Sequence, residues 1–288
     1  MPNLTATSAP TFGRFFLPGP TEVLPDVLAA QTRPMIGHRG KGMEQLIAQM
    51  MPGLQRIFRT QRPIYLSASS ATGLMEASVR SCGGRRVLAL VNGAFSDRFF
   101  RISQMNGIET ESLEVPMGQV HLPEFVEAEL RRRKYDAVTV VHSETSTGAL
   151  NPIRELAEVV HRSGDTLLLV DSVSGVAGAP VETDDWKLDF ILTGSQKAFA
   201  LPPGLAFGVA NERALERARH TQNRGIYFDL LEFESYIRKN QTPNTPALSL
   251  LFALAYQVDR ISAETIEVRW ARHQAMAERT WRFADEMR

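Results

Sequence analysis

The fold of this chain is indicated most directly by the stretch Phe190-Ile191-Leu192-Thr193-Gly194-Ser195-Gln196-Lys197-Ala198, which is soon followed by Leu201-Pro202-Pro203-Gly204. Its apolar beginning predicts a short buried strand, and the small polar residues after it predict a turn. The prolines stiffen the backbone beyond that turn. Lys197 is therefore expected on a rigid, partly desolvated support, where burial lowers the pKa of an amine and makes it a nucleophile for Schiff-base chemistry. Taken alone, a lysine in a loop is usually a surface residue.

A second motif upstream favours the Schiff-base interpretation of Lys197. It is the run Leu167-Leu168-Leu169-Val170-Asp171-Ser172-Val173. Four apolar residues in a row are typical of a parallel strand buried on both faces. Asp171 at its carboxyl end lies where open α/β sheets bind ligands. A strand-end lysine and a strand-end aspartate together match the needs of pyridoxal phosphate (PLP): the lysine bonds to the aldehyde, and the carboxylate keeps the ring nitrogen protonated. Taken alone, Asp171 is equally well explained as a cap.

Short apolar runs alternate with amphipathic stretches along the chain. Strands are predicted near residues 64–66, 86–91, 110–115, 137–141, 167–171, 190–192 and 205–209, and helices near 72–81, 97–105, 122–133 and 153–161. The last part of the chain, from about residue 230 to 288, is predicted to be helical, with apolar residues at helical spacing over 246–260 and an amphipathic stretch over 264–288. Such alternation predicts an α/β fold with a mostly parallel sheet that helices cover on both faces.

In this order, the aspartate motif, Gly-Ser-Gln-Lys and Pro-Pro-Gly resemble the class V aminotransferases of PLP fold type I. The chain is most similar to alanine–glyoxylate and serine–pyruvate aminotransferases, beginning at Leu17-Pro18-Gly19-Pro20-Thr21. The resemblance implies an enzyme that moves the amino group of alanine or serine to glyoxylate or pyruvate. Lys197 and Asp171 would be its catalytic residues, with Lys197 first bonded to the cofactor and then moving the proton of the substrate's Cα.

Small hydroxylated residues precede the predicted helix at 72–81, which suits a phosphate at a helix N-terminus or an ordinary helix cap. The resemblance implies that this segment holds the cofactor phosphate. Other strand ends carry further positions: the family places an aromatic ring against the cofactor near Asn92-Gly93-Ala94-Phe95, although a phenylalanine is more often core. The cofactor-binding residues implied in this way are Ser70, Ala71, Thr72, Phe95, Thr145, Val173 and Gln196, together with Asp171 and Lys197. Glu144 and His142 lie beside Thr145 without an assigned role, and His142 is equally well explained as a buried, hydrogen-bonded histidine.

The resemblance also implies a homodimer with shared active sites, in which the loop carrying Gln241 and Thr242 contacts the partner's cofactor phosphate. Arg39, in Gly37-His38-Arg39-Gly40-Lys41, is a candidate for binding an anionic substrate group. Related phosphoserine aminotransferases use a similar His-Arg pair, so phosphoserine stays an alternative substrate. A surface arginine explains the same residue equally well.

The amino-acid composition argues against several other classes of protein. The 288 residues carry 32 basic and 32 acidic side chains, which gives no electrostatic reason to expect nucleic acid as a partner. No apolar run is long enough for a membrane span, and the six histidines lack metal-ligand spacing. One cysteine, Cys82, fits a reducing compartment, so a cytoplasmic protein is expected. Cysteine desulfuration is a rival chemistry, but Cys82 is badly placed for it.

The resemblance divides the chain into an N-terminal arm over residues 1–20, a PLP-binding large domain over 21–262, and a long helix over 263–288. In the family this helix leads to a small C-terminal domain, which the chain is expected to lack. A PLP-binding fragment without activity is therefore a second alternative.

Overall fold

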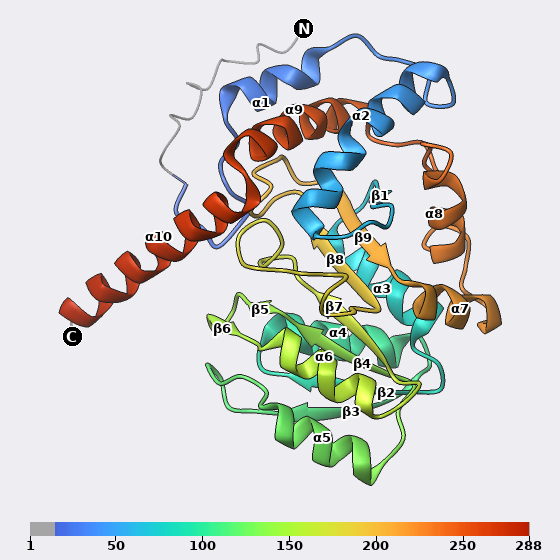
Figure 1. The fold of residues 1–288 in the computed structure, drawn as a ribbon, viewed down its shortest axis with the longest axis vertical. Coiled ribbons are helices and arrows are strands. Elements are labelled where there is room, and N and C mark those ends of the chain that lie inside the picture. Colours follow the sequence, from blue (N-terminus) through green and yellow to red (C-terminus); the bar gives the residue numbers. More distant parts are fainter. Residues whose placement is uncertain (1–14, 288) are drawn as a thin grey trace, which may run out of the picture.

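The structure, a computed structural model, describes residues 15–287. Its centre is a seven-stranded sheet with the order β1-β9-β8-β7-β4-β2-β3 (Figure 1). The strands are β1 (Tyr65–Ser67), β2 (Arg86–Val91), β3 (Glu109–Glu114), β4 (Ala137–Val141), β7 (Leu167–Asp171), β8 (Phe190–Gly194) and β9 (Ala206–Ala210). A two-stranded ribbon of β5 (Ser143–Glu144) and β6 (Ala149–Leu150) follows β4.

The mostly parallel sheet is confirmed, with one exception. Strands β3, β2, β4, β7 and β8 pair in parallel, whereas β9 runs antiparallel to both of its neighbours, β8 and β1. The reversal follows from the short connection of residues 195–205 between β8 and β9, because a parallel pair needs a crossover of a dozen or more residues. That connection contains Lys197 and the Pro-Pro-Gly turn.

Helices cover both faces of the sheet, as predicted. Crossover connections place α3 and α4 against one face and α6, with α5 packed beside it, against the other. The helices are α1 (Pro25–Ala29), the 3-10 turn η1 (Ala30–Thr32), α2 (Lys41–Phe58), α3 (Ala71–Cys82), α4 (Ala94–Met105), α5 (Pro123–Arg132), α6 (Ile153–Arg162), α7 (Glu212–His220), α8 (Leu230–Ile237), α9 (Leu248–Glu264) and α10 (Ile266–Glu286). Helices α1, α2 and α7 were not predicted from the sequence.

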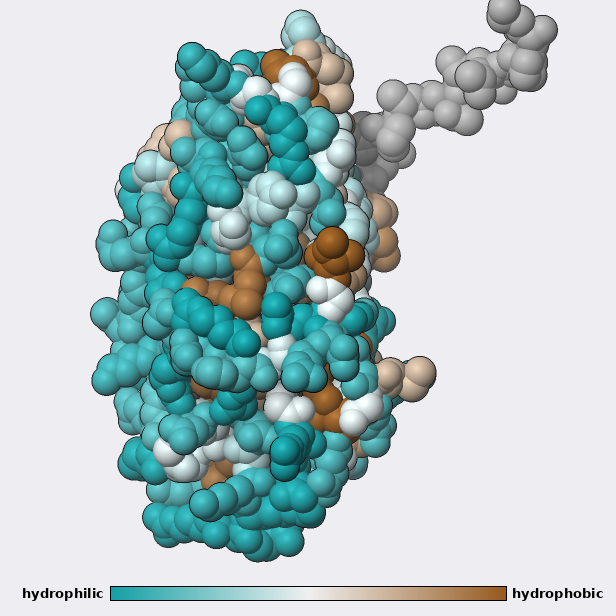
Figure 2. Space-filling model, turned by 90° about the vertical axis from the view of Figure 1, so that its right-hand side faces the viewer, coloured by the Kyte–Doolittle hydropathy of each residue, from teal (hydrophilic) through white to brown (hydrophobic). Residues whose placement is uncertain are grey.

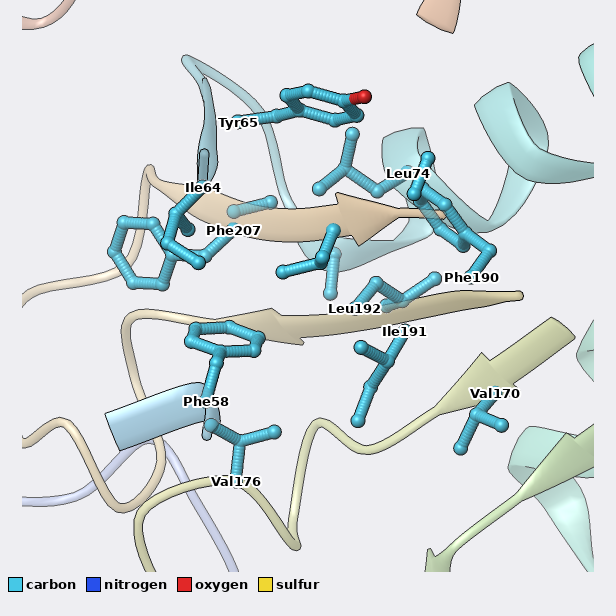
Figure 3. Packing of buried hydrophobic residues seen from close by; sticks show 14 of the residues in the cluster. Phe58, Ile64, Tyr65, Leu74, Val170, Val176, Phe190, Ile191, Leu192 and Phe207 are labelled. Carbon is cyan, nitrogen blue, oxygen red and sulfur yellow. The ribbon is translucent and has the colours of Figure 1, made fainter. Parts of the chain in front are cut away.

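The core lies around β8 and β9 (Figure 3). Phe58, at the end of α2, packs near Val176 on one side of β8, and Phe190, Leu192 and Phe207 are completely buried in the same cluster. Burying side chains of this size stabilises the fold by about 1.5–3 kcal/mol each. The core therefore fixes the strands whose carboxyl ends carry Asp171 and Lys197.

α2 packs closely on α9, where a Cβ at Gly53 would lie only 2.2 Å from Val258 Cγ1. In Figure 1, α10 extends away from the rest of the molecule. The face shown in Figure 2 is largely hydrophilic, with separate hydrophobic patches. Within residues 15–287, no helix is long and apolar enough to cross a membrane. Residues 1–14 of the predicted arm, and Arg288 at the end of the predicted last helix, lie outside the described residues.

Candidate active site

A cavity of about 190 Å³ opens at the carboxyl ends of the parallel strands. Connections after β1, β2, β4, β7 and β8 all contribute to it, as expected for a ligand site in an open α/β sheet. Nine of the residues predicted from the sequence line it: Ser70, Ala71, Thr72, Phe95, Thr145, Asp171, Val173, Gln196 and Lys197.

Lys197 is half-buried and held from several sides. Its Nζ donates a hydrogen bond to the carbonyl oxygen of Pro18 and lies 6.0 Å from the centre of the Phe95 ring. Thr21 fixes the backbone at this point, because its Oγ1 donates to the Lys197 carbonyl at 3.2 Å and its N–H donates to the Gln196 carbonyl at 2.9 Å. Burial lowers the pKa of Lys197, and nearby Asp171 partly opposes that shift. The amine is thus more readily neutral than an ordinary lysine.

Asp171 is the last residue of β7, and only 2% of it is exposed. Within the described residues, its carboxyl accepts one hydrogen bond, from the Val173 N–H to Oδ1 at 2.8 Å. Burial raises the pKa of Asp171 to about 7; the Val173 N–H opposes this shift, and the charge of Glu144 adds to it. A buried carboxyl that lines a cavity without a cationic partner in contact suits a ligand that brings a proton donor or a positive charge.

The segment predicted from the sequence to hold a phosphate forms the first turn of α3, and this turn borders the cavity. Ser70 is its N-cap but makes no side-chain capping hydrogen bond, and Ser70, Ala71 and Thr72 all face the cavity. The first N–H groups of a helix have no partner within the helix and carry partial positive charge, so they favour an anion.

Glu144 has a structural role that the sequence analysis missed. Its fully buried carboxylate accepts hydrogen bonds from the backbone N–H groups of Phe95, Ser96 and Ser146 and from both serine hydroxyls. Burial would raise the pKa of Glu144, but the hydrogen bonds from Ser146 and Ser96 outweigh it and hold the pKa below its usual value. Glu144 thereby anchors the first turn of α4, which carries Phe95. In the sequence, this role is signalled by the position of an acidic residue next to Thr145, a predicted cofactor-binding residue.

Arg98 also lines the cavity and was missed. It lies one turn beyond Phe95 on α4, and its Cζ is 5.3 Å from the centre of the Phe95 ring. The spacing of three residues between an aromatic residue predicted for the site and an arginine was the available signal.

Thr145 and His142 lie on either side of Glu144 in the chain. Thr145 Oγ1 is 2.5 Å from Ser174 Oγ, and both residues line the cavity. His142 is buried, its Nδ1 lies 3.0 Å from Ser172 Oγ, and burial lowers its pKa to about 4. His142 is therefore a neutral, hydrogen-bonded histidine at neutral pH, one of the two interpretations left open.

The other three predicted residues lie outside the cavity and close to one another. Gln241 donates a hydrogen bond to Glu44, and the Thr242 hydroxyl donates to the Asn244 carbonyl. Arg39 donates to the carbonyls of Thr242 and Pro243 and stacks 5.0 Å from the ring centre of Tyr236. The Arg39 guanidinium is thus engaged with the loop that carries Thr242. In the described part of the chain, no cluster of three or more His, Cys, Asp or Glu side chains is suited to hold a metal ion.

Residues 84–287 match the family "Aminotransferase class-V". The chain belongs to this family. It is 41% identical over 271 residues to an uncharacterised aminotransferase of Methanocaldococcus jannaschii, an alignment that covers 92% of this chain and 70% of that protein. It is 31% identical over 292 residues to the serine–glyoxylate aminotransferase of Methylorubrum extorquens, covering 96% and 72% of the two chains.

The solved structures agree with this assignment. The alanine–glyoxylate aminotransferase of Nostoc sp. superposes with a TM-score of 0.88 at 27% identity, over 93% of this chain and 73% of that one. The class V aminotransferase and its fold type, both predicted from the sequence motifs, are therefore confirmed.

Pyridoxal phosphate is the cofactor of this family, and the cavity fits it on three grounds. A cavity of about 150 Å³ is enough for a benzene molecule, so about 190 Å³ admits a substituted six-membered ring. The Asp171 carboxyl can accept a further hydrogen bond from a protonated ring nitrogen, and the first turn of α3 can bind an anion such as a phosphate. The half-buried Lys197 amine lies in the same cavity.

Proposed function

We propose that this enzyme transfers the amino group of a small amino acid, alanine or serine, to a 2-oxo acid such as glyoxylate or pyruvate. The observation that carries this proposal is that Lys197 and Asp171 line one cavity with the first turn of α3. The similarity to relatives named for serine–glyoxylate and alanine–glyoxylate transfer supports the choice of substrates.

Each residue has a distinct part in this reaction. When bound, pyridoxal phosphate supplies an electron sink for the substrate's Cα. Lys197 Nζ would anchor the cofactor. As a free amine it would take the proton from the Cα of the amino donor and, in the second half of the reaction, deliver a proton to the carbonyl carbon of the 2-oxo acid, for which its lowered pKa suits it. Asp171 stabilises positive charge on the ring nitrogen, and Val173 orients its carboxyl through the 2.8 Å hydrogen bond.

The remaining cavity residues position the cofactor. Ser70, Ala71 and Thr72 would hold its phosphate at the first turn of α3, and Gln196 would add a further contact to that phosphate. Phe95 would lie against the ring, and Thr145 would hydrogen-bond the hydroxyl oxygen attached to the ring. Arg98 brings a positive charge to the same cavity, which favours anionic substrates such as amino and 2-oxo acids.

We also propose a cytoplasmic homodimer in which residues 21–262 form the cofactor-binding domain and residues 263–288, which include α10, form the segment that leaves it. Gln241 and Thr242 lie together with Arg39 outside this protomer's cavity, which supports a role for their loop in the partner's site. Sedimentation of the loaded protein checks the dimer. A monomer that binds the cofactor with full affinity would contradict it.

A donor panel tests the reaction itself. Protein loaded with pyridoxal phosphate is incubated with glyoxylate and one of alanine, serine, aspartate or phosphoserine, and glycine formation is followed. Alanine or serine is expected to be the best donor, and Lys197→Ala is expected to form no glycine. Preference for phosphoserine would favour the alternative substrate, and no transfer from any donor would favour a fragment without activity.

A further inference from the structure

One buried side chain, Arg269, contacts both of the loops that follow Asp171 and Lys197. Arg269 lies in the first turn of α10 and is only 8% exposed. Its Nε donates to the carbonyl of Ala177 at 3.1 Å, and one of its terminal nitrogens donates to the carbonyl of Ala198. Ala198 directly follows Lys197, and Ala177 lies six residues beyond Asp171.

We infer that Arg269 is a positioning residue for this reaction, one that sets the spacing between Asp171 and Lys197 by holding their two loops together. This inference rests on the proposed function of those two residues. Arg269 itself is outside the residues that line the cavity, so it acts through the backbone rather than on the substrate.

The chemistry of the contact explains why an arginine stands here. A guanidinium presents several N–H donors in a rigid plane, so one group can reach carbonyls in two loops, whereas a lysine offers a single ammonium on a flexible stem. The third side of the guanidinium faces Glu264, whose carboxylate lies 2.8 Å from it. This ion pair offsets the desolvation of the buried charge.

A neighbouring contact holds the same turn. The Gln257 side chain on α9 is buried and donates to the Phe199 carbonyl at 2.8 Å. The backbone carbonyls of Ala198 and Phe199 are thus held by side chains from two helices, α10 and α9. Ala177 has a left-handed backbone with φ of 68°, a strained conformation for a residue with a Cβ, and the Arg269 contact helps to maintain it.

The chain offers a matched control in Arg272, one turn further along α10. Arg272 also pairs with Glu264, at 2.6 Å, but its side chain is 45% exposed and its hydrogen bonds in the described structure go to Glu264 alone. Replacing Arg272 removes a charge from the same acidic partner without releasing either loop.

The test compares Arg269→Gln and Arg269→Lys with Arg272→Gln and the unchanged protein. One measurement needs no cofactor: the pH dependence of acetylation of Lys197 in the empty protein, followed by mass spectrometry, reports the pKa of its amine. The second is the Kd for pyridoxal phosphate from titration of the empty protein.

In Arg269→Gln the Lys197 pKa is expected to rise toward that of an ordinary lysine, since the loosened loop exposes the amine, and the Kd is expected to rise about tenfold or more, because small misplacements of reacting groups are costly. Arg269→Lys keeps the charge and is expected to change the Lys197 pKa and the Kd less than Arg269→Gln does. It replaces Arg269→Gln in the test if the glutamine variant does not fold. Arg272→Gln should stay within about twofold.

Folded Arg269 variants with an unchanged Lys197 pKa and an unchanged Kd would overturn the inference, even if they unfold more easily. If the unchanged protein itself does not bind pyridoxal phosphate through Lys197, the proposed function fails instead. The two failures are therefore distinguishable.

Discussion

Asp171 is expected to make the empty protein less stable at neutral and alkaline pH. Its carboxyl is buried with one hydrogen bond, and burial raises its pKa from 3.8 to about 7. The folded state therefore binds the proton more tightly than the unfolded state does. Ionisation of Asp171 therefore lowers the free energy of unfolding as pH rises from about 4 to about 7, and the destabilisation reaches its full size above pH 7.

The size of the effect follows from the pKa shift. Roughly three pKa units at 1.36 kcal/mol each give about 4 kcal/mol of destabilisation above pH 7, and about 1.5 kcal/mol remains near pH 5. Asp171→Asn removes the ionisable group but keeps an oxygen that can accept the Val173 N–H. The empty variant is therefore expected to be more stable than the unchanged protein by up to about 4 kcal/mol at pH 8, although it should bind pyridoxal phosphate poorly.

Urea unfolding of both empty proteins at pH 5 and pH 8 measures the difference. Asp259→Asn, an exposed carboxyl on α9, is the control and should change the free energy of unfolding by less than about 0.5 kcal/mol. If Asp171→Asn gives no stabilisation at pH 8, or the same stabilisation at both pH values, ionisation of the buried carboxyl does not destabilise the folded protein as described.

Three further outcomes are expected. Glu144→Gln should lower the free energy of unfolding by about 1–3 kcal/mol in a thermal melt, because an amide cannot accept all the hydrogen bonds from Phe95 and Ser96; an unchanged melting temperature would refute this anchoring role. Gly19→Ala should weaken pyridoxal phosphate binding in a fluorescence titration, since its Cβ would lie 2.7 Å from Lys197 Nζ and Gly19 has φ of 118°; wild-type affinity would contradict the close approach. Cys82 should resist thiol reagents until the protein unfolds, because it is buried and burial raises its pKa to about 12; rapid labelling of the folded protein would show otherwise.

Strands with uninterrupted apolar runs were predictable almost to the residue. β2 and β4 begin and end where the sequence indicates, because each is flanked by polar or turn-forming residues. Helix α2 was not predicted, although 18 residues form it. Pro52 and Gly53 lie inside it and usually argue against a helix; the close packing on α9 at Gly53 outweighs that local preference.

The cavity residues adjacent to strand ends were predictable because the chemistry follows the strands in sequence. Glu144 and Arg269 were not recognised, since they act largely through partners that are distant in the chain. Arg98 was missed although its partner Phe95 is only three residues away. Arg269, for example, contacts the carbonyl of a residue 92 positions away. No local pattern marks such a contact, and only the folded structure brings its partners together.

The most direct test of the account locates the bond between protein and cofactor. The protein is loaded with pyridoxal phosphate, reduced with borohydride to fix the cofactor on whichever amine holds it, digested and analysed by mass spectrometry. The chain has five lysines: Lys41, Lys134, Lys187, Lys197 and Lys239. We expect the pyridoxyl group on Lys197 alone, and none on the Lys197→Ala variant. Labelling of another lysine in place of Lys197, or undiminished labelling of the variant, would contradict the central claim.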